Sequence, residues 1–128
     1  MIELQKVSED ARGEIYVLKD KGIEIASLEG YNTGAPRGGH HHLFPETKTV
    51  IYGKLEYWRV NPRDINNEIK SIISKGERIC VEPGLAHLFV AQENSLLFVT
   101  REGGFEVTMY PPYRKIVDDY LAQNKNDS

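Results

Sequence analysis

The sequence has one cysteine, a small net charge and no long apolar run, and each of these features excludes a class of protein. Cys80 is the one cysteine among 128 residues, which rules out an internal disulfide and suits a reducing cytoplasm. A net charge of −3 gives no electrostatic case for nucleic acid or anionic membranes as partners. No apolar run approaches the roughly 20 residues that span a bilayer, and no secretory segment is expected.

The chain has the composition of one compact domain in which short β-type runs alternate with turns. Hydrophobic residues make up 40% and charged residues 27%, which is ordinary for a globular domain of this length. Runs rich in β-branched and aromatic residues recur roughly every nine to ten residues, a spacing typical of an all-β barrel or sandwich. The predicted strands cover residues 14–18, 22–28, 47–52, 55–60, 69–73, 77–81, 86–91, 95–100 and 105–109.

Three local features add specific predictions to this pattern. Gly53 and Lys54 predict a two-residue hairpin turn between the strands that precede and follow them. The polar stretch 61–67 predicts a solvated loop, or alternatively a lid over one end of the barrel. Cys80 lies in the middle of a predicted strand, and we expect its side chain to be buried.

The end of the chain changes from strand to helix periodicity. After two prolines, apolar residues recur at i, i+3, i+4, i+7 and i+8 from Tyr113 to Leu121, which marks one face of a helix. We expect this helix to pack on the barrel or on a partner subunit, and its apolar face favours a homodimer. The predicted organisation is one domain, with the barrel in residues 1–112 and the helix and a polar tail in residues 113–128.

Histidine is concentrated in one short stretch, and a carboxylate follows it closely. In a β-strand the side chains of His40 and His42 share one face, while His41 points to the other. A turn after His42 can return Glu46 to the same place, and His87 lies further along the chain. Three imidazoles and one carboxylate form a ligand set for a divalent transition metal such as Fe, Mn, Ni, Co, Cu or Zn. The sequence therefore predicts a metal site of His40, His42, Glu46 and His87.

The spacing of these residues resembles the first signature motif of the cupin superfamily. The fixed positions of that motif correspond here to Gly34, His40, His42, Glu46 and Gly53. Residues 76–91 are similar to the second motif, which places His87 after a Pro-Gly pair, although Glu82 and Ala91 stand where the motif has proline and asparagine. The resemblance implies an all-β fold, a double-stranded β-helix or jelly roll, with the metal inside it, to which the periodicity described above adds one C-terminal α-helix.

A second resemblance narrows the family to its sugar branch. Asp10-Ala-Arg12-Gly13 together with Arg37-Gly-Gly-His40 is similar to cupins that include nucleotide keto-sugar 3,5-epimerases and 3,4-isomerases. The resemblance implies that Arg37 or the metal holds substrate oxygens, and that His40 or His87 moves the proton next to the carbonyl. The epimerases share a tyrosine acid on the strand after the second motif, and residues 95–100 contain none. Tyr52, Tyr57 or Tyr110 could take its place, and Tyr52 and Tyr57 are candidate substrate-binding residues.

The site predicted in this way is compatible with three functions on a small oxygen-rich molecule. The first is isomerisation or epimerisation of a keto sugar or sugar phosphate, with proton transfer by a histidine. The second is a metal-dependent dioxygenase, because three histidines and one glutamate also serve that chemistry in cupins. The third is a non-catalytic cupin that binds a small molecule. We favour the first, because both sugar-branch motifs support it.

Overall fold

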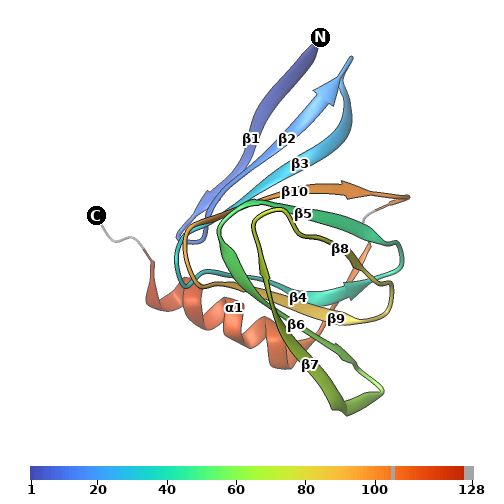
Figure 1. Cartoon of the computed structure of the whole chain (residues 1–128), viewed down its shortest axis with the longest axis vertical. Coiled ribbons are helices and arrows are strands. Elements are labelled where there is room, and N and C mark those ends of the chain that lie inside the picture. The colour runs from blue at the N-terminus through green and yellow to red at the C-terminus, as the bar shows by residue number, and fades with distance from the viewer. Residues whose placement is uncertain (105, 126–128) are drawn as a thin grey trace.

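In the computed structural model, which describes residues 1–104 and 106–125, two antiparallel sheets face each other and one helix follows them (Figure 1). The six-stranded sheet contains, in spatial order, β1 (Ile2–Asp10), β2 (Gly13–Asp20), β3 (Ile23–Tyr31), β10 (Ser95–Arg101), β5 (Glu46–Tyr52) and β8 (Arg78–Val81). The five-stranded sheet contains β11 (Val107–Met109), β4 (Pro36–His42), β9 (Ala86–Ala91), β6 (Lys54–Asn61) and β7 (Asp64–Ser74). Helix α1 spans Pro111–Gln123.

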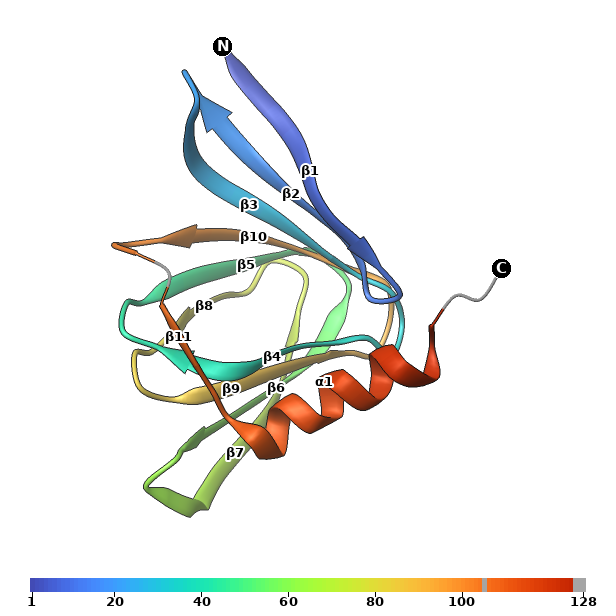
Figure 2. The same cartoon turned by 180° about the vertical axis from the view of Figure 1, so that it is seen from behind.

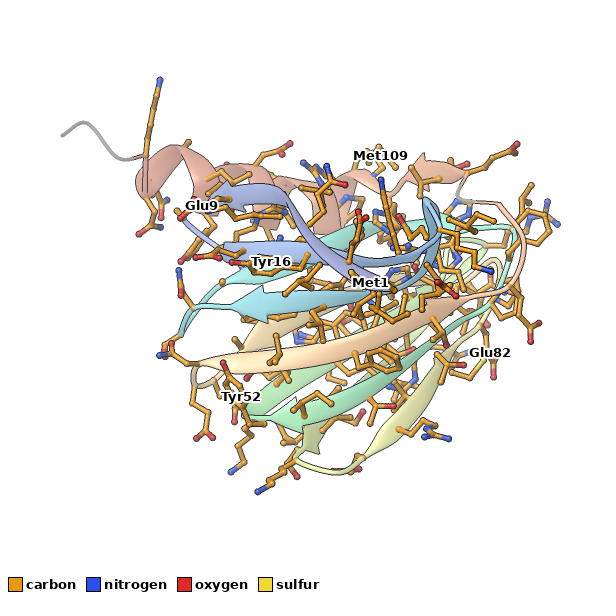
Figure 3. All side chains as sticks on the ribbon, turned by 90° about the horizontal axis from the view of Figure 1, so that it is seen from above. Met1, Glu9, Tyr16, Tyr52, Glu82 and Met109 are labelled. Atoms are coloured by element: carbon orange, nitrogen blue, oxygen red, sulfur yellow. The ribbon has the colours of Figure 1, made fainter. Side chains whose placement is uncertain are left out.

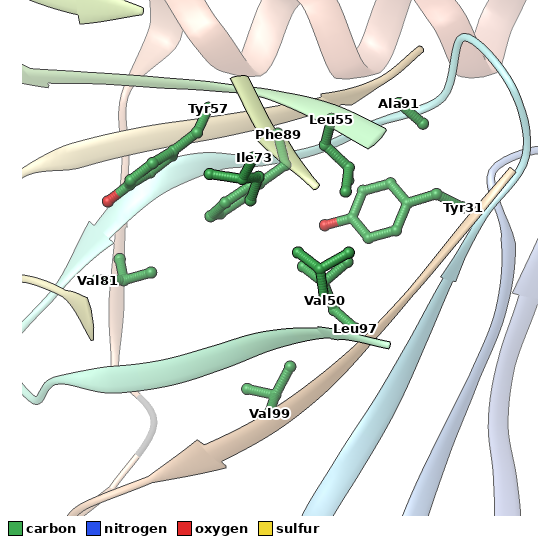
Figure 4. Close-up of a cluster of buried hydrophobic side chains, with 10 residues drawn as sticks. All are labelled: Tyr31, Val50, Leu55, Tyr57, Ile73, Val81, Phe89, Ala91, Leu97 and Val99. Carbon is green, nitrogen blue, oxygen red and sulfur yellow. The ribbon is translucent and has the colours of Figure 1, made fainter. Parts of the chain in front are cut away.

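The inner faces of the two sheets enclose the main hydrophobic core (Figure 4). Alternation along each strand sends every second side chain inward, so that both sheets contribute to one cluster. Burying each large aliphatic or aromatic side chain of this kind stabilises the fold by about 1.5–3 kcal/mol. The cluster consists of Tyr31, Val50, Leu55, Tyr57, Ile73, Val81, Phe89, Ala91, Leu97 and Val99.

Helix α1 covers the outer face of the five-stranded sheet (Figure 2). Tyr113 and Val117 of the helix are buried against Val60 and Leu88, in a second apolar cluster. Strand β6 therefore has apolar residues on both faces, because one faces the barrel core and the other faces the helix. This explains why the alternation of apolar residues in β6 does not mark a single buried face.

The first three strands extend beyond the barrel as an antiparallel ribbon (Figures 1 and 2). Strand β1 lies at the edge of the six-stranded sheet and pairs only with β2 in the described residues. Its apolar side chains Ile2 and Leu4 are 53% and 57% exposed, so the ribbon presents hydrophobic surface at a free sheet edge. Strand β1 has no counterpart among the strands predicted from the sequence.

The prediction of an all-β jelly roll with one C-terminal helix is confirmed. The helix begins at Pro111, two residues before the predicted start, and ends at Gln123. Residue 105, the start of the last predicted strand, and residues 126–128 of the predicted tail lie outside the described residues. Within the described residues, no helix has the length and apolar character needed to cross a membrane.

The predictions of a hairpin at Gly53 and of a buried Cys80 were wrong, and the largely exposed stretch 61–67 is a loop over only part of its length. Strands β5 and β6 belong to different sheets, so Gly53 turns the chain from one sheet to the other instead of closing a hairpin. The stretch 61–67 contains only a tight turn, since β7 already begins at Asp64. Cys80 is exposed, because β8 is an edge strand whose alternate side chains point away from the core.

Candidate metal centre

Three histidines converge inside the barrel from two adjacent strands of the five-stranded sheet. His40 and His42 lie on β4, and His87 lies on β9 directly opposite His40 in the strand register. One ring nitrogen of each histidine lies within 4.8 Å of the other two. The ring of His87 is centred 4.8 Å from that of His40 and 5.0 Å from that of His42. The structure thus brings together the three histidines that the sequence singled out and leaves His41 outside the cluster.

A glycine bulge in β4 sets this arrangement. The register between β4 and β9 shifts between Gly38 and His40, and both Gly38 and Gly39 have positive φ angles, of 113° and 83°. A Cβ atom at Gly38 would lie 2.7 Å from the backbone oxygen of His87, so β9 can approach only a glycine there. A Cβ atom at Gly39 would lie 2.7 Å from the Cα atom of Arg114 in α1. The absence of side chains at the two glycines therefore lets β9 pack closely against Gly38 and the helix pack closely against Gly39.

Glu46 reaches the histidines from the opposite sheet. It lies at the start of β5, is 3% exposed, and its Oε1 atom is 3.2 Å from Nε2 of His42. Its other carboxylate oxygen accepts a hydrogen bond from Nε of Arg101. Burial acts to raise the pKa of Glu46, but the positive charges of Lys48 and Arg101 and the hydrogen bond with His42 outweigh it and hold the pKa well below its usual value. The carboxylate is therefore ionised and adjoins the histidine cluster through His42.

The protein environment keeps two of the imidazoles neutral. Burial, together with the positive charge of Lys48 and neighbouring His42, lowers the pKa of His40 to about 4. Burial and the positive charge of Lys48 also hold the pKa of His87 well below its ordinary value. Neutral imidazole is the form that binds a metal, because the ring nitrogen must have a free lone pair. The donor set, with His40 and His87 in the neutral form, fits a divalent transition metal.

A buried ion pair lies beside the cluster in the barrel interior. Lys48 is 5% exposed, and its Nζ atom lies 2.9 Å from Oε1 of Glu29 on β3 and 3.9 Å from Oε1 of Glu46. The same ammonium group is 4.6 Å from the centre of the Phe89 ring. Sequence analysis missed Lys48, although alternation from Glu46 places it on the same inward face of β5. Lys48 is a source of positive charge next to the candidate metal centre.

The residues predicted to bind substrate are distributed over different parts of the fold. Arg37 donates hydrogen bonds from Nε and Nη2 to the backbone oxygen of Gly30, at 3.0 and 2.8 Å, so its guanidinium joins β4 to β3. Tyr52 is 49% exposed and lines a cavity of about 330 Å³ that none of the three histidines lines. Tyr57 is buried and stacks on Phe89, whose ring centre is 5.9 Å from that of His87. Of these three residues, the structure connects Tyr57 with the histidine cluster.

Two cavities lie near the cluster; His42 lines the first, and the second shares the lining residue Leu85 with it. One, of about 450 Å³, is lined by His41 and His42 together with the loops that precede β7 and β9. The other, of about 360 Å³, is lined by Tyr57, Arg59, Ile79, Cys80, Glu82 and Leu85. Arg59 lies opposite His87 in the register between β6 and β9, and sequence analysis did not single it out. Only the pairing of β6 with β9 reveals its position, and that pairing has no local signal in the sequence.

Comparison with known proteins shows the fold and no closer relationship. Neither a model of a protein family nor a curated protein matches the chain. Among solved structures, the capsular polysaccharide assembling protein CapF from Staphylococcus aureus matches with a TM-score of 0.69 and 20% identity over 81% of this chain. The CENP-C cupin domain of Drosophila melanogaster matches with a TM-score of 0.64 and 15% identity over 78% of this chain and 76% of its own.

A third similar structure is a single-residue variant of oxalate decarboxylase from Bacillus subtilis, with a TM-score of 0.64 and 21% identity over 81% of this chain. This chain covers 30% of the CapF chain and 29% of the oxalate decarboxylase chain, so it corresponds to a part of each. These likenesses show that the chain has the cupin fold.

Proposed function

We propose that this cupin-fold chain binds one divalent transition metal and acts on a small oxygen-rich molecule at that metal. His40, His42, His87 and Glu46 are the proposed ligands, and Fe, Mn, Ni, Co, Cu or Zn are the candidate ions. The observation that carries the proposal is the convergence of three imidazoles within 4.8 Å of one another, two of them buried and that of His40 partly buried. The lowered pKa values of His40 and His87 support it, because both imidazoles are neutral at pH 7.

The surrounding residues have separate tasks in this proposal. A bound metal supplies Lewis acidity toward a carbonyl or hydroxyl oxygen of the substrate. Arg101 holds one oxygen of Glu46, which leaves the oxygen 3.2 Å from His42 directed toward the cluster. The ammonium group of Lys48, fixed by Glu29, adds positive charge that favours developing negative charge on substrate oxygens.

For the reaction, we propose isomerisation or epimerisation of a keto sugar or sugar phosphate. The fold likeness to a capsular polysaccharide assembling protein supports a sugar-related substrate. A neutral imidazole can accept the proton next to a carbonyl, which makes His40 and His87 the candidate bases, and the one that does so would have to release the metal, because its lone pair cannot bind both. His40 is the less buried of the two and is therefore the better placed to meet a substrate.

The metal proposal is tested by elemental analysis of the purified protein and of two histidine variants. We expect about one metal per chain, as for a site with one set of histidine and carboxylate ligands. His87→Gln should lower the metal content at least about tenfold, because it removes a central ligand. His41→Gln is the matched control, since His41 belongs to the same strand but lies outside the cluster. Equal metal content in all three proteins would refute the proposed ligands.

The reaction proposal is tested by incubating the metal-loaded protein with keto-sugar nucleotides and keto-sugar phosphates in deuterium oxide. We expect deuterium at the carbon next to the carbonyl, detected by mass spectrometry, because proton removal and return exchange that position with solvent. His87→Gln should abolish this exchange and His41→Gln should preserve it. Absence of exchange across the panel would reject this reaction. Oxygen uptake would then favour a dioxygenase, and saturable binding without turnover a non-catalytic cupin.

We also propose that the protein is a cytoplasmic homodimer. The apolar face of the helix, from which the sequence predicted the dimer, is not the proposed contact. The apolar face of α1 is occupied within the chain, since Tyr113 and Val117 are buried against the five-stranded sheet. The exposed Ile2 and Leu4 on the outlying strand β1 are better candidates for a contact between subunits. The single cysteine, which cannot form an internal disulfide, supports a reducing compartment.

A further inference from the structure

Arg59 is placed next to the histidine cluster by strand pairing. It lies on β6 directly opposite His87 on β9, and directly opposed residues of antiparallel strands project from the same face of the sheet. That face is the inner one, because Tyr57 and Phe89, the next opposed pair, belong to the barrel core. The side chain of Arg59 therefore projects from the same inner face as that of His87, and its guanidinium group is directed toward Ser71 on β7.

The guanidinium group is held in place by neutral partners. Its Cζ atom lies 4.5 Å from the centre of the Tyr57 ring, and Nη1 donates a hydrogen bond to Oγ of Ser71 at 3.0 Å. Stacking on an aromatic ring fixes the plane of the guanidinium without neutralising its charge. Arg59 is thus preorganised and keeps donor atoms available for a further partner.

Two charged groups beside the cluster are paired with opposite charges, whereas Arg59 is not paired with any described carboxylate. Lys48 is paired with Glu29, and Glu46 is paired with Arg101. No carboxylate in the described part of the chain forms an ion pair with Arg59, and Glu82, which lines the same cavity, is exposed. A divalent metal held by neutral histidines and one carboxylate would add further positive charge. The site would then carry an excess of positive charge that a ligand must balance.

A cavity adjoins Arg59. Its volume of about 360 Å³ suits a small molecule, and Tyr57 and Leu85 line it together with Arg59. None of its described lining residues is a histidine, but Leu85 also lines the cavity of about 450 Å³ that His42 lines. A molecule that occupies both cavities would contact His42 at one end and Arg59 at the other.

We propose that Arg59 binds the anionic group of the substrate, a phosphate or a carboxylate, through two parallel hydrogen bonds from its guanidinium. The inference rests on the proposed function, which it sharpens: the substrate is a charged sugar derivative or a comparably small anion and not a neutral sugar. The planar fork of a guanidinium matches both phosphate and carboxylate oxygens, whereas an ammonium group acts only as a point charge.

The test is calorimetric titration of inorganic phosphate and, separately, malonate into metal-loaded and metal-free protein. Arg59→Met should raise the Kd of the preferred anion at least about tenfold, since charge-assisted paired hydrogen bonds are lost. Arg59→Lys keeps the positive charge but loses the paired donors of the guanidinium group. We therefore expect its Kd to lie between those of the wild type and of Arg59→Met. Arg78→Met is the matched control, because Arg78 is an exposed arginine whose Nε atom donates to Oγ1 of Thr49. This control should bind as the wild type does.

The outcomes separate this inference from the metal proposal. Tighter binding of phosphate than of malonate assigns a phosphate group, and the reverse order assigns a carboxylate. If the protein takes up no metal but still binds an anion in a manner that depends on Arg59, the inference stands although the metal proposal fails. A wild-type protein that binds neither anion, or an Arg59→Met variant that binds both unchanged, overturns the inference. If Arg59→Met does not fold, an unchanged Kd in Arg59→Lys overturns it equally.

Discussion

Lys48 is the residue that departs most from what a stable barrel interior requires. Burial alone would lower the pKa of Lys48, but Glu29, Tyr31 and Glu46 together raise it above its ordinary value, so the side chain stays charged. The core also contains the hydroxyl of Tyr31, which has no hydrogen-bond partner among the described residues and points into the apolar cluster (Figure 4). Such groups reduce stability, and the position of Lys48 beside the histidine cluster is consistent with a binding site.

Removing Lys48 alone should strongly destabilise the protein. Lys48→Met removes the ammonium nitrogen that lies 2.9 Å from Oε1 of Glu29, and Glu29 is only 8% exposed. Leaving one member of a buried ion pair without its partner lowers the free energy of unfolding by about 3–5 kcal/mol. The double variant Lys48→Met/Glu29→Met should recover much of this loss, because apolar side chains replace both charges. The free energies of unfolding from urea denaturation measure both effects.

An exposed ion pair provides the control for this comparison. Lys115 and Asp119 form a pair at 2.6 Å on the outer surface of α1, and Lys115→Met should change the stability little, because water screens such pairs. If Lys48→Met lost no more stability than Lys115→Met, the barrel interior would have to be far more hydrated than the low exposure of Lys48 indicates.

At the scale of single elements, local pattern predicted strands and the helix but not the sheet to which each strand belongs. Gly53 has a φ angle of 100°, which suits a hairpin turn, yet a Cβ atom there would lie 2.0 Å from Oγ of Ser95. That close approach comes from a strand some forty residues away and carries no local signal. The same reason explains Cys80, whose exposure depends on β8 being an edge strand.

The candidate site was predictable to the extent that it depends on residue spacing. The spacing of His40, His42 and His87 sufficed to predict their convergence, which the cluster bears out. Arg37 was assigned a substrate role from its motif, but the structure shows its guanidinium bonded to the backbone of Gly30, a contact that depends on how β4 meets β3. Arg59 was missed for the complementary reason, since its position beside His87 follows from a long-range strand register.

At the scale of the whole molecule, the outer face of the six-stranded sheet carries the proposed dimer contact. Leu4 of β1 is opposed to Leu18 of β2, and Leu28 of β3 is opposed to Phe98 of β10, so these apolar side chains share one face. The neighbouring residue Val99 belongs to the barrel core, which places this face outside. Figure 3 views these strands from above. Two copies related by a two-fold axis would bury the same face on each subunit.

A charge on this face should therefore dissociate the dimer. Leu4 is 57% exposed in the single chain, and Leu4→Lys would place an ammonium group in an apolar contact, raising the Kd of dimerisation at least about tenfold. Sedimentation velocity across a concentration series measures the shift. Ile65→Lys is the control, because Ile65 is 63% exposed on β7 of the other sheet, away from this face. A wild type that sediments as a monomer at all concentrations, or a control that dissociates as readily as Leu4→Lys, would exclude this face as the contact.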